Sequence, residues 1–239
     1  MDNNQPPRIF DEALEVESGS ISKNFVANVF SWMALGLLIT AAVSWYGATS
    51  GLYLQLMQAG GIVPWVLMLS PFAFIIAMNA GLEKFSATTI TLLFIAFSAV
   101  MGLSLSSVFL VYGLGSVANV FAITAGTFTL MAIAGYTTSV DLSRFGSILF
   151  MGLIGIILAS IANYFIGSSG LEYIVSILGV LIFTGLVAYD TQRIKRIAAG
   201  IEYSGTNNAT KLSILAATSL YLNFINLFLF LLRFFGGRD

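Results

Sequence analysis

The chain has no cysteine and no histidine, and it has few charged residues for its length. Of its 239 residues, 9% are charged and 58% are hydrophobic, whereas a soluble domain carries about 25% charged residues. The missing side chains exclude disulfides, thiol nucleophiles, thiolate metal sites and histidine acid–base chemistry. Any response to pH near neutrality must therefore come from carboxylates.

The small charged fraction also narrows the classes of partner. The net charge is −1, so the chain offers no overall basic field for nucleic acid. No cluster of carboxylates lies within the apolar runs, and we predict neither an enzyme active site nor a bound cofactor. The bilayer itself is the first partner that this composition indicates.

Apolar runs long enough to cross a membrane fill most of the chain. A spanning helix needs about 20 apolar residues, and seven segments approach or exceed that length. We predict an all-α membrane protein with seven transmembrane helices in a domain over residues 25–239. The segments are 25–46, 62–80, 89–112, 117–136, 145–166, 173–188 and 212–235. The sixth is short, and we expect it to continue past Asp190 to a basic cluster.

The first 24 residues differ from the rest. They are acidic and do not have the basic start of a cleavable signal peptide. We predict a disordered cytoplasmic tail over residues 1–24. With this end inside, eight basic residues fall in cytoplasmic segments and two on the opposite side, as the positive-inside rule requires. A re-entrant last segment would instead return the C-terminus to the cytoplasm.

Small residues at four-residue spacing predict helix contacts by close backbone approach. Gly155, Ala159 and Asn163 form one such row in the fifth segment, and Ala122 and Gly126 form another in the fourth. We interpret both as packing seams without chemistry.

The last segment has polar residues on one face. Ser219, Asn223 and Asn226 follow one another at i, i+4 and i+7, which places them on one side of a helix. Amides in a membrane helix need partners. This face therefore contacts other helices through hydrogen bonds, or it lines a polar path.

Asp190 is the acid that lies closest to the hydrocarbon region. It follows an apolar run and precedes Arg193 by three residues, about one helical turn inside the membrane boundary. An intramembrane carboxylate is a candidate functional residue. The alternative is an interfacial salt bridge to Arg193 or Lys195.

Two sequence motifs are distinctive: Ala-Tyr-Asp-Thr-Gln at residues 188–192, and Leu-Tyr-Leu-Asn-Phe-Ile-Asn-Leu-Phe at residues 220–228. Together they resemble the motifs of the Bax inhibitor family, which includes bacterial YccA-like proteins. The resemblance implies a seven-helix bundle in which the last helix is central within two groups of three. It also implies a pH-controlled calcium leak, sensed by a pair of aspartates. The neutral loops suggest a bacterial member in the cytoplasmic (inner) membrane.

One position departs from the family pattern. Asp190 matches the first aspartate, but the second position is Asn223. Two close carboxylates cannot both ionise cheaply, and an amide removes that coupling. The resemblance therefore supports permeation more than proton sensing.

Calcium prefers several oxygen ligands. Asp190, Asn223, Asn226 and backbone carbonyls could form a weak, transient calcium site along an ion pathway. Candidate counter-charges are Arg193, Lys195 and Arg196.

Two other functions can be considered. Some bacterial relatives are similar to modulators of a membrane-anchored AAA protease, and the tail over residues 1–24 could engage such a partner. A seven-helix photoreceptor would need a lysine deep in the last helix, but Lys211 lies at its mouth, so we reject that class.

Overall fold

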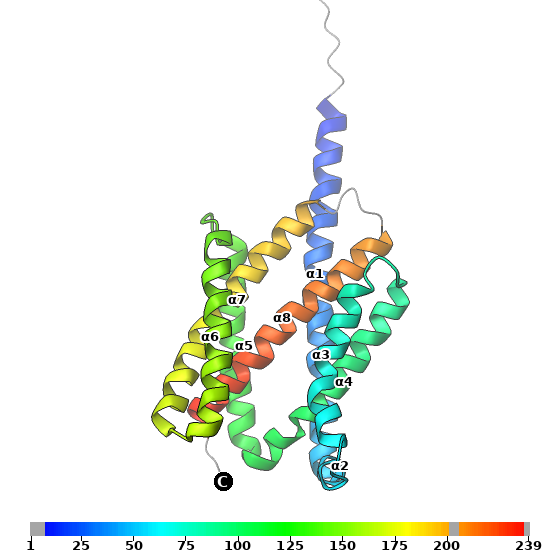
Figure 1. Ribbon diagram of the computed structural model, residues 1–239. Helices are drawn as coiled ribbons and strands as arrows, with labels where there is room; N and C mark the ends of the chain where they lie inside the picture. Colours follow the sequence, from blue (N-terminus) through cyan, green and yellow to red (C-terminus); the bar gives the residue numbers. More distant parts are fainter. Residues whose placement is uncertain (1–7, 201–205, 237–239) are drawn as a thin grey trace, which may run out of the picture.

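The computed structural model describes residues 8–200 and 206–236, and these residues form eight helices and no strand (Figure 1). The helices are α1 (Arg8–Thr49), α2 (Leu52–Gln58), α3 (Val63–Ala80), α4 (Ala87–Val111), α5 (Leu114–Thr137), α6 (Ser143–Ile166), α7 (Ser169–Gly200) and α8 (Thr206–Phe235).

Local sequence explains several helix boundaries. The Ser86 hydroxyl accepts a hydrogen bond from the Thr89 backbone N–H at 3.1 Å and so caps the start of α4. Gly167 ends α6 with a φ of 69°, a left-handed conformation that favours glycine. The turn allows α7 to begin at Ser169 and pack against α6.

Seven of the helices in the described residues are long and apolar enough to cross a membrane, which confirms the predicted fold class. The first candidate span is Asn24–Thr49, close to the predicted start at residue 25. Helical backbone in α1 nevertheless begins at Arg8, inside the segment that we assigned to a tail; residues 1–7 lie outside the described residues. The sixth span continues past Asp190 to Gly200, and the short α2 was not predicted.

Helix α8 is the central helix of the bundle. In its most apolar window 61% of the residues are buried, against 6% to 33% in the other six spans. It contacts α1, α3 and α4 on one side and α5 and α7 on the other, while α6 packs on α7. Figure 1 shows α8 running diagonally between these two groups.

The two ends of the bundle differ in charge. The end at which α7 stops and α8 starts has Lys84, Arg144, Arg193 and Lys211 at or near it, and we call it the basic end. We call the other end, where α8 stops, the Arg233 end. Helix α1 starts on the side of the basic end and α8 finishes at the Arg233 end (Figure 1).

The predicted small-residue seams are not where the backbones approach one another. A Cβ atom added to Gly126 or Gly155 would meet no heavy atom within 4 Å. Close approach occurs instead at Gly135 of α5, where an added Cβ would overlap the backbone carbonyl of Ala188 in α7. The seam prediction was therefore wrong at both glycines, and α5 meets α7 two residues before Asp190.

Candidate functional site

Asp190 lies inside the bundle, hydrogen-bonded to α8. Its side chain accepts a hydrogen bond from the Ser219 hydroxyl at 2.5 Å and another from the Asn223 amide at 2.8 Å. Asp190 and Asn223 are each 7% exposed. The structure therefore brings together the aspartate and asparagine of the two motifs, and it adds Ser219 to them.

The helical repeat explains this arrangement. Ser219 and Asn223 are one turn apart on α8, so their side chains reach the same point on α7. A buried carboxylate is costly unless hydrogen bonds compensate the lost hydration. Both donors bond to Oδ2, and no hydrogen bond from the described residues reaches Oδ1.

A cavity of about 360 Å³ adjoins this carboxylate. It lies between α3, α7 and α8 and extends toward the basic end, where Leu82 and Arg193 line it. Its polar lining comes from Asn79, Asp190, Arg193, Thr218 and Ser219. A space of this size with these side chains can admit water and a small cation.

Aromatic rings pack around α8 next to Asn223. The Phe224 ring lies 5.3 Å from that of Phe121 and 5.6 Å from that of Phe128. The Tyr221 ring lies 5.3 Å from Phe97. These rings come from α4, α5 and α8 and pack α8 against its two neighbours.

A second polar contact fixes the same helix against α1. The hydroxyl groups of Thr40 and Tyr221 are 2.7 Å apart, and the Thr40 hydroxyl donates to the Ser98 carbonyl at 2.9 Å. All three residues are buried. This network ties α1, α4 and α8 together close to the level of Asn223.

The remaining candidate residues are placed elsewhere. The Asn226 amide donates to the Leu222 carbonyl of its own helix at 2.8 Å, and Asn226 does not line the cavity beside Asp190. Among the three basic residues named as counter-charges, Arg193 lines that cavity. Lys195 instead donates to the Tyr136 carbonyl at 2.9 Å.

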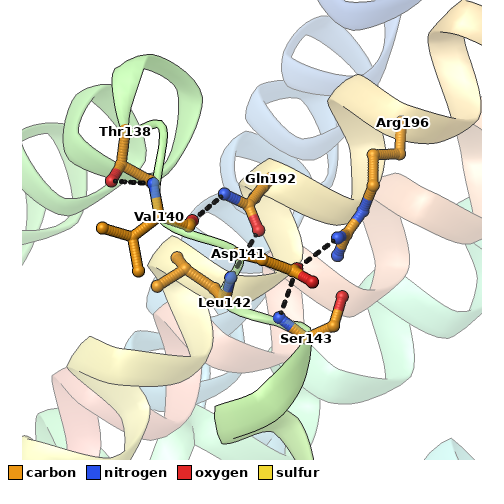
Figure 2. A network of polar contacts seen from close by, with 7 residues as sticks. All are labelled: Thr138, Val140, Asp141, Leu142, Ser143, Gln192 and Arg196. Atoms are coloured by element: carbon orange, nitrogen blue, oxygen red, sulfur yellow. Dashed lines mark hydrogen bonds and ion pairs between the residues drawn. The ribbon is translucent and has the colours of Figure 1, made fainter.

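Gln192 and Arg196 fasten the α5–α6 loop to α7 (Figure 2). The Gln192 side chain accepts from the Leu142 backbone N–H at 2.8 Å and donates to the Val140 carbonyl at 2.7 Å. The Arg196 guanidinium pairs with Asp141 at 2.8 Å. The sequence did not predict these contacts, because the paired residues lie about 50 positions apart and no sequence motif links them.

The charge of Asp141 is stabilised in this loop, outside the membrane spans. The Ser143 backbone N–H, the Ser143 hydroxyl and Arg196 lower the pKa of Asp141 from 3.8 to about 2. Asp141 therefore stays ionised at every physiological pH.

Lys211 makes a further contact at the basic end. Its ammonium group donates to the Leu82 carbonyl at 2.7 Å and so joins the start of α8 to the loop after α3. In the described residues no group of three or more histidine, cysteine, aspartate or glutamate side chains converges on one point.

Known proteins resemble this chain over nearly its whole length. The protein-family model described as "Inhibitor of apoptosis-promoting Bax1" matches residues 22–239. The inner membrane protein YbhL of Escherichia coli strain K12 is 46% identical over 216 residues, which cover 90% of this chain and 92% of that protein. An uncharacterized protein of Borreliella burgdorferi is 42% identical over 230 residues, 96% of this chain and 99% of the relative.

A third relative, an uncharacterized protein of Deinococcus radiodurans, is 39% identical over 219 residues, 91% of this chain and 92% of the relative. These descriptions name no enzymatic reaction. The family match covers all seven spans and both motifs around Asp190 and Asn223. The chain is a multi-pass membrane protein that belongs to the Bax inhibitor family.

Proposed function

We propose that this protein is a calcium-permeable leak channel of a bacterial inner membrane, with its gate at Asp190 and Asn223. The observation that carries the proposal is the position of Asp190. A buried carboxylate, held by two donors of the central helix, borders a cavity with polar side chains. Intramembrane acids of this kind mark ion pathways.

The hydrogen bonds between α7 and α8 keep the path closed. Calcium entering the cavity meets the carboxylate of Asp190 and the side-chain oxygens of Asn79 and Ser219. Oxygen ligands of this kind suit a hard cation, and a single carboxylate gives weak, transient binding. Passage requires that the Asp190 contacts break and that the Phe224 ring moves from its neighbours.

Calcium flux in proteoliposomes that contain only this protein tests the proposal. We expect wild-type protein to conduct calcium above the protein-free background and Asp190→Ala to change the flux by about tenfold, or about 1.4 kcal/mol, because the substitution removes both the hydrogen bonds that close the path and an oxygen that calcium would contact. Asp141→Ala is the matched control, because it removes an exposed acid outside the spans, and its flux should equal that of wild type.

Each variant must first be shown to be monodisperse and helical. Equal flux through wild type and a folded Asp190→Ala variant would reduce Asp190 to a structural contact. A wild-type protein that conducts no calcium without other proteins would contradict the channel. That result would favour the alternative hypothesis that the protein modulates a membrane-anchored AAA protease.

A further inference from the structure

A groove runs between α7 and α8 at the Arg233 end, far from Asp190. Its outer part is a cavity of about 370 Å³ whose polar lining comes from Ser169, Glu172, Ser176 and Arg233. Its inner part is an apolar cavity of about 170 Å³ lined by residues such as Ile177 and Leu231. Phe234 lines both parts, so the groove changes from polar to apolar along the helices.

The groove has the depth of one membrane leaflet. Its lining on α7 runs from Ser169 to Leu181, a rise of about 18 Å at 1.5 Å per residue. A leaflet has about 15 Å of hydrocarbon beneath its headgroup region. The polar part therefore lies at the height of headgroups and the apolar part at the height of acyl chains.

The surroundings of the groove are those of a lipid-facing surface. Ile174, Leu178 and Leu181 are exposed on α7. The rings of Tyr173 and Phe234 lie 5.3 Å apart at the mouth of the groove, and aromatic rings are enriched at membrane interfaces. Lipid is therefore the molecule that meets this groove at the highest local concentration.

Arg233 supplies the charge for a phosphate. Its Cζ atom lies 5.5 Å from the centre of the Phe230 ring, a stacking contact that engages none of the N–H donors of the guanidinium. The planar fork of those donors matches the oxygens of a phosphodiester. An apolar cavity beneath a phosphate site gives a free inorganic anion no advantage, whereas it accommodates an acyl chain.

We propose that the groove binds one glycerophospholipid of the surrounding bilayer. The phosphodiester contacts Arg233, and an acyl chain lies in the apolar cavity against Ile177 and Leu231. The bound lipid covers the junction of α7 and α8, the two helices that hold Asp190. The proposal does not depend on the channel function.

Native mass spectrometry of the purified protein, titrated with phosphatidylglycerol in mixed micelles, tests the headgroup contact. We expect Arg233→Gln to weaken binding of the first lipid by about tenfold, or about 1.4 kcal/mol, and Arg233→Lys to restore part of the loss. Arg144→Gln is the matched control, because Arg144 is also exposed but lies at the basic end. Equal binding by the Arg233→Gln and Arg144→Gln variants would overturn the proposal.

A second pair of variants tests the acyl-chain part. Leu181→Trp should fill the apolar cavity and lower the affinity, whereas Leu158→Trp on α6 should not; the two leucines are 63% and 61% exposed. Glycerol 3-phosphate, a headgroup without chains, should fail to displace the lipid at equal concentration. Displacement by glycerol 3-phosphate would show a site for phosphate alone and would contradict a lipid site.

Discussion

Within the part of the chain that the structure describes, Asp190 has two neutral hydrogen-bond donors and no acidic partner. Ser219 and Asn223 both donate to one of its oxygens. In the described residues, the nearest basic side chain on the same helix face is Arg193, which lines the same cavity. The polar contact between α7 and α8 at Asp190 is therefore made by a single acid and two groups that do not titrate near neutral pH.

Asn223→Asp should make the calcium flux depend more steeply on pH. It would place a second carboxylate against Asp190, and two adjacent carboxylates cannot both ionise cheaply. At low pH a shared proton would join the pair and keep the path closed; at high pH mutual repulsion would open it. Calcium flux through proteoliposomes at a series of pH values between about 6 and 8 measures this.

The control for this prediction is Asn226→Asp. Asn226 bonds its own helix rather than Asp190, so its replacement should not produce the same steep rise in flux with pH. If wild type already switches as steeply as the Asn223→Asp variant, a carboxylate pair is not what sets the response. An unchanged profile for Asn223→Asp would contradict contact between the two side chains in the membrane.

Part of this site could be predicted from the sequence. The i, i+4 spacing of Ser219 and Asn223 indicates one helix face, and the motifs indicate that Asn223 meets Asp190. We grouped Asn226 with them because of its spacing. Its side-chain amide instead donates a hydrogen bond to the Leu222 carbonyl, one turn earlier in the same helix. The contribution of Asn79 to the cavity could not be predicted, because it depends on the angle at which α3 crosses α8.

At the scale of the helices, the contact between α5 and α7 depends on one glycine. An added Cβ on Gly135 would overlap the Ala188 carbonyl, so Gly135→Leu must push the two helices apart. We expect a loss of about 1 to 3 kcal/mol in the free energy of unfolding. Gly126→Leu on the same helix is the control, because nothing lies within 4 Å of its added Cβ. Thermal unfolding in detergent compares the two, and an equal loss would contradict the assigned seam.

Lengths of helices were easier to predict than their contacts. Spans are visible because each needs an apolar run of fixed length, and α7 continues past Asp190 because its last turns are amphipathic. The small-residue rows at Gly126 and Gly155 were misleading, since small side chains also occur on open faces. Gly135 belongs to no such row, and α2 has only seven residues, too few for a pattern.

The ion pair between Asp141 of the α5–α6 loop and Arg196 predicts that the stability of the fold depends on pH in the acid range. Because the folded protein holds the pKa of Asp141 near 2 instead of 3.8, its ionisation stabilises the fold above about pH 4. This contribution declines as the pH falls toward 2. The difference in melting temperature between wild type and Asp141→Asn should therefore shrink from pH 6 to pH 3. A constant difference would show that Asp141 acts through its shape and not through its charge.

At the scale of the whole molecule, the described residues contain an odd number of candidate spans between the start of α1 and the end of α8. Seven candidate spans place the start of α1 and the end of α8 at opposite ends of the bundle (Figure 1). The distribution of basic residues predicts that the basic end faces the cytoplasm. Reporter fusions at both termini should show the N-terminus inside and the C-terminus outside. A cytoplasmic signal from the C-terminal reporter would refute the seven-span topology.

The absence of cysteine from the sequence makes the central claim directly measurable. Ala216 lines the cavity beside Asp190, so Ala216→Cys introduces one thiol into the proposed path. Arg144→Cys, at an exposed position of the basic end, is the control for labelling outside it. A membrane-impermeant cationic thiol reagent, applied from the side of the basic end, is added during the calcium flux assay. If calcium passes through this cavity, the reagent should block calcium flux through the Ala216→Cys protein and leave flux through the Arg144→Cys protein unchanged. Full labelling of Ala216→Cys with undiminished calcium flux would contradict the proposed pathway.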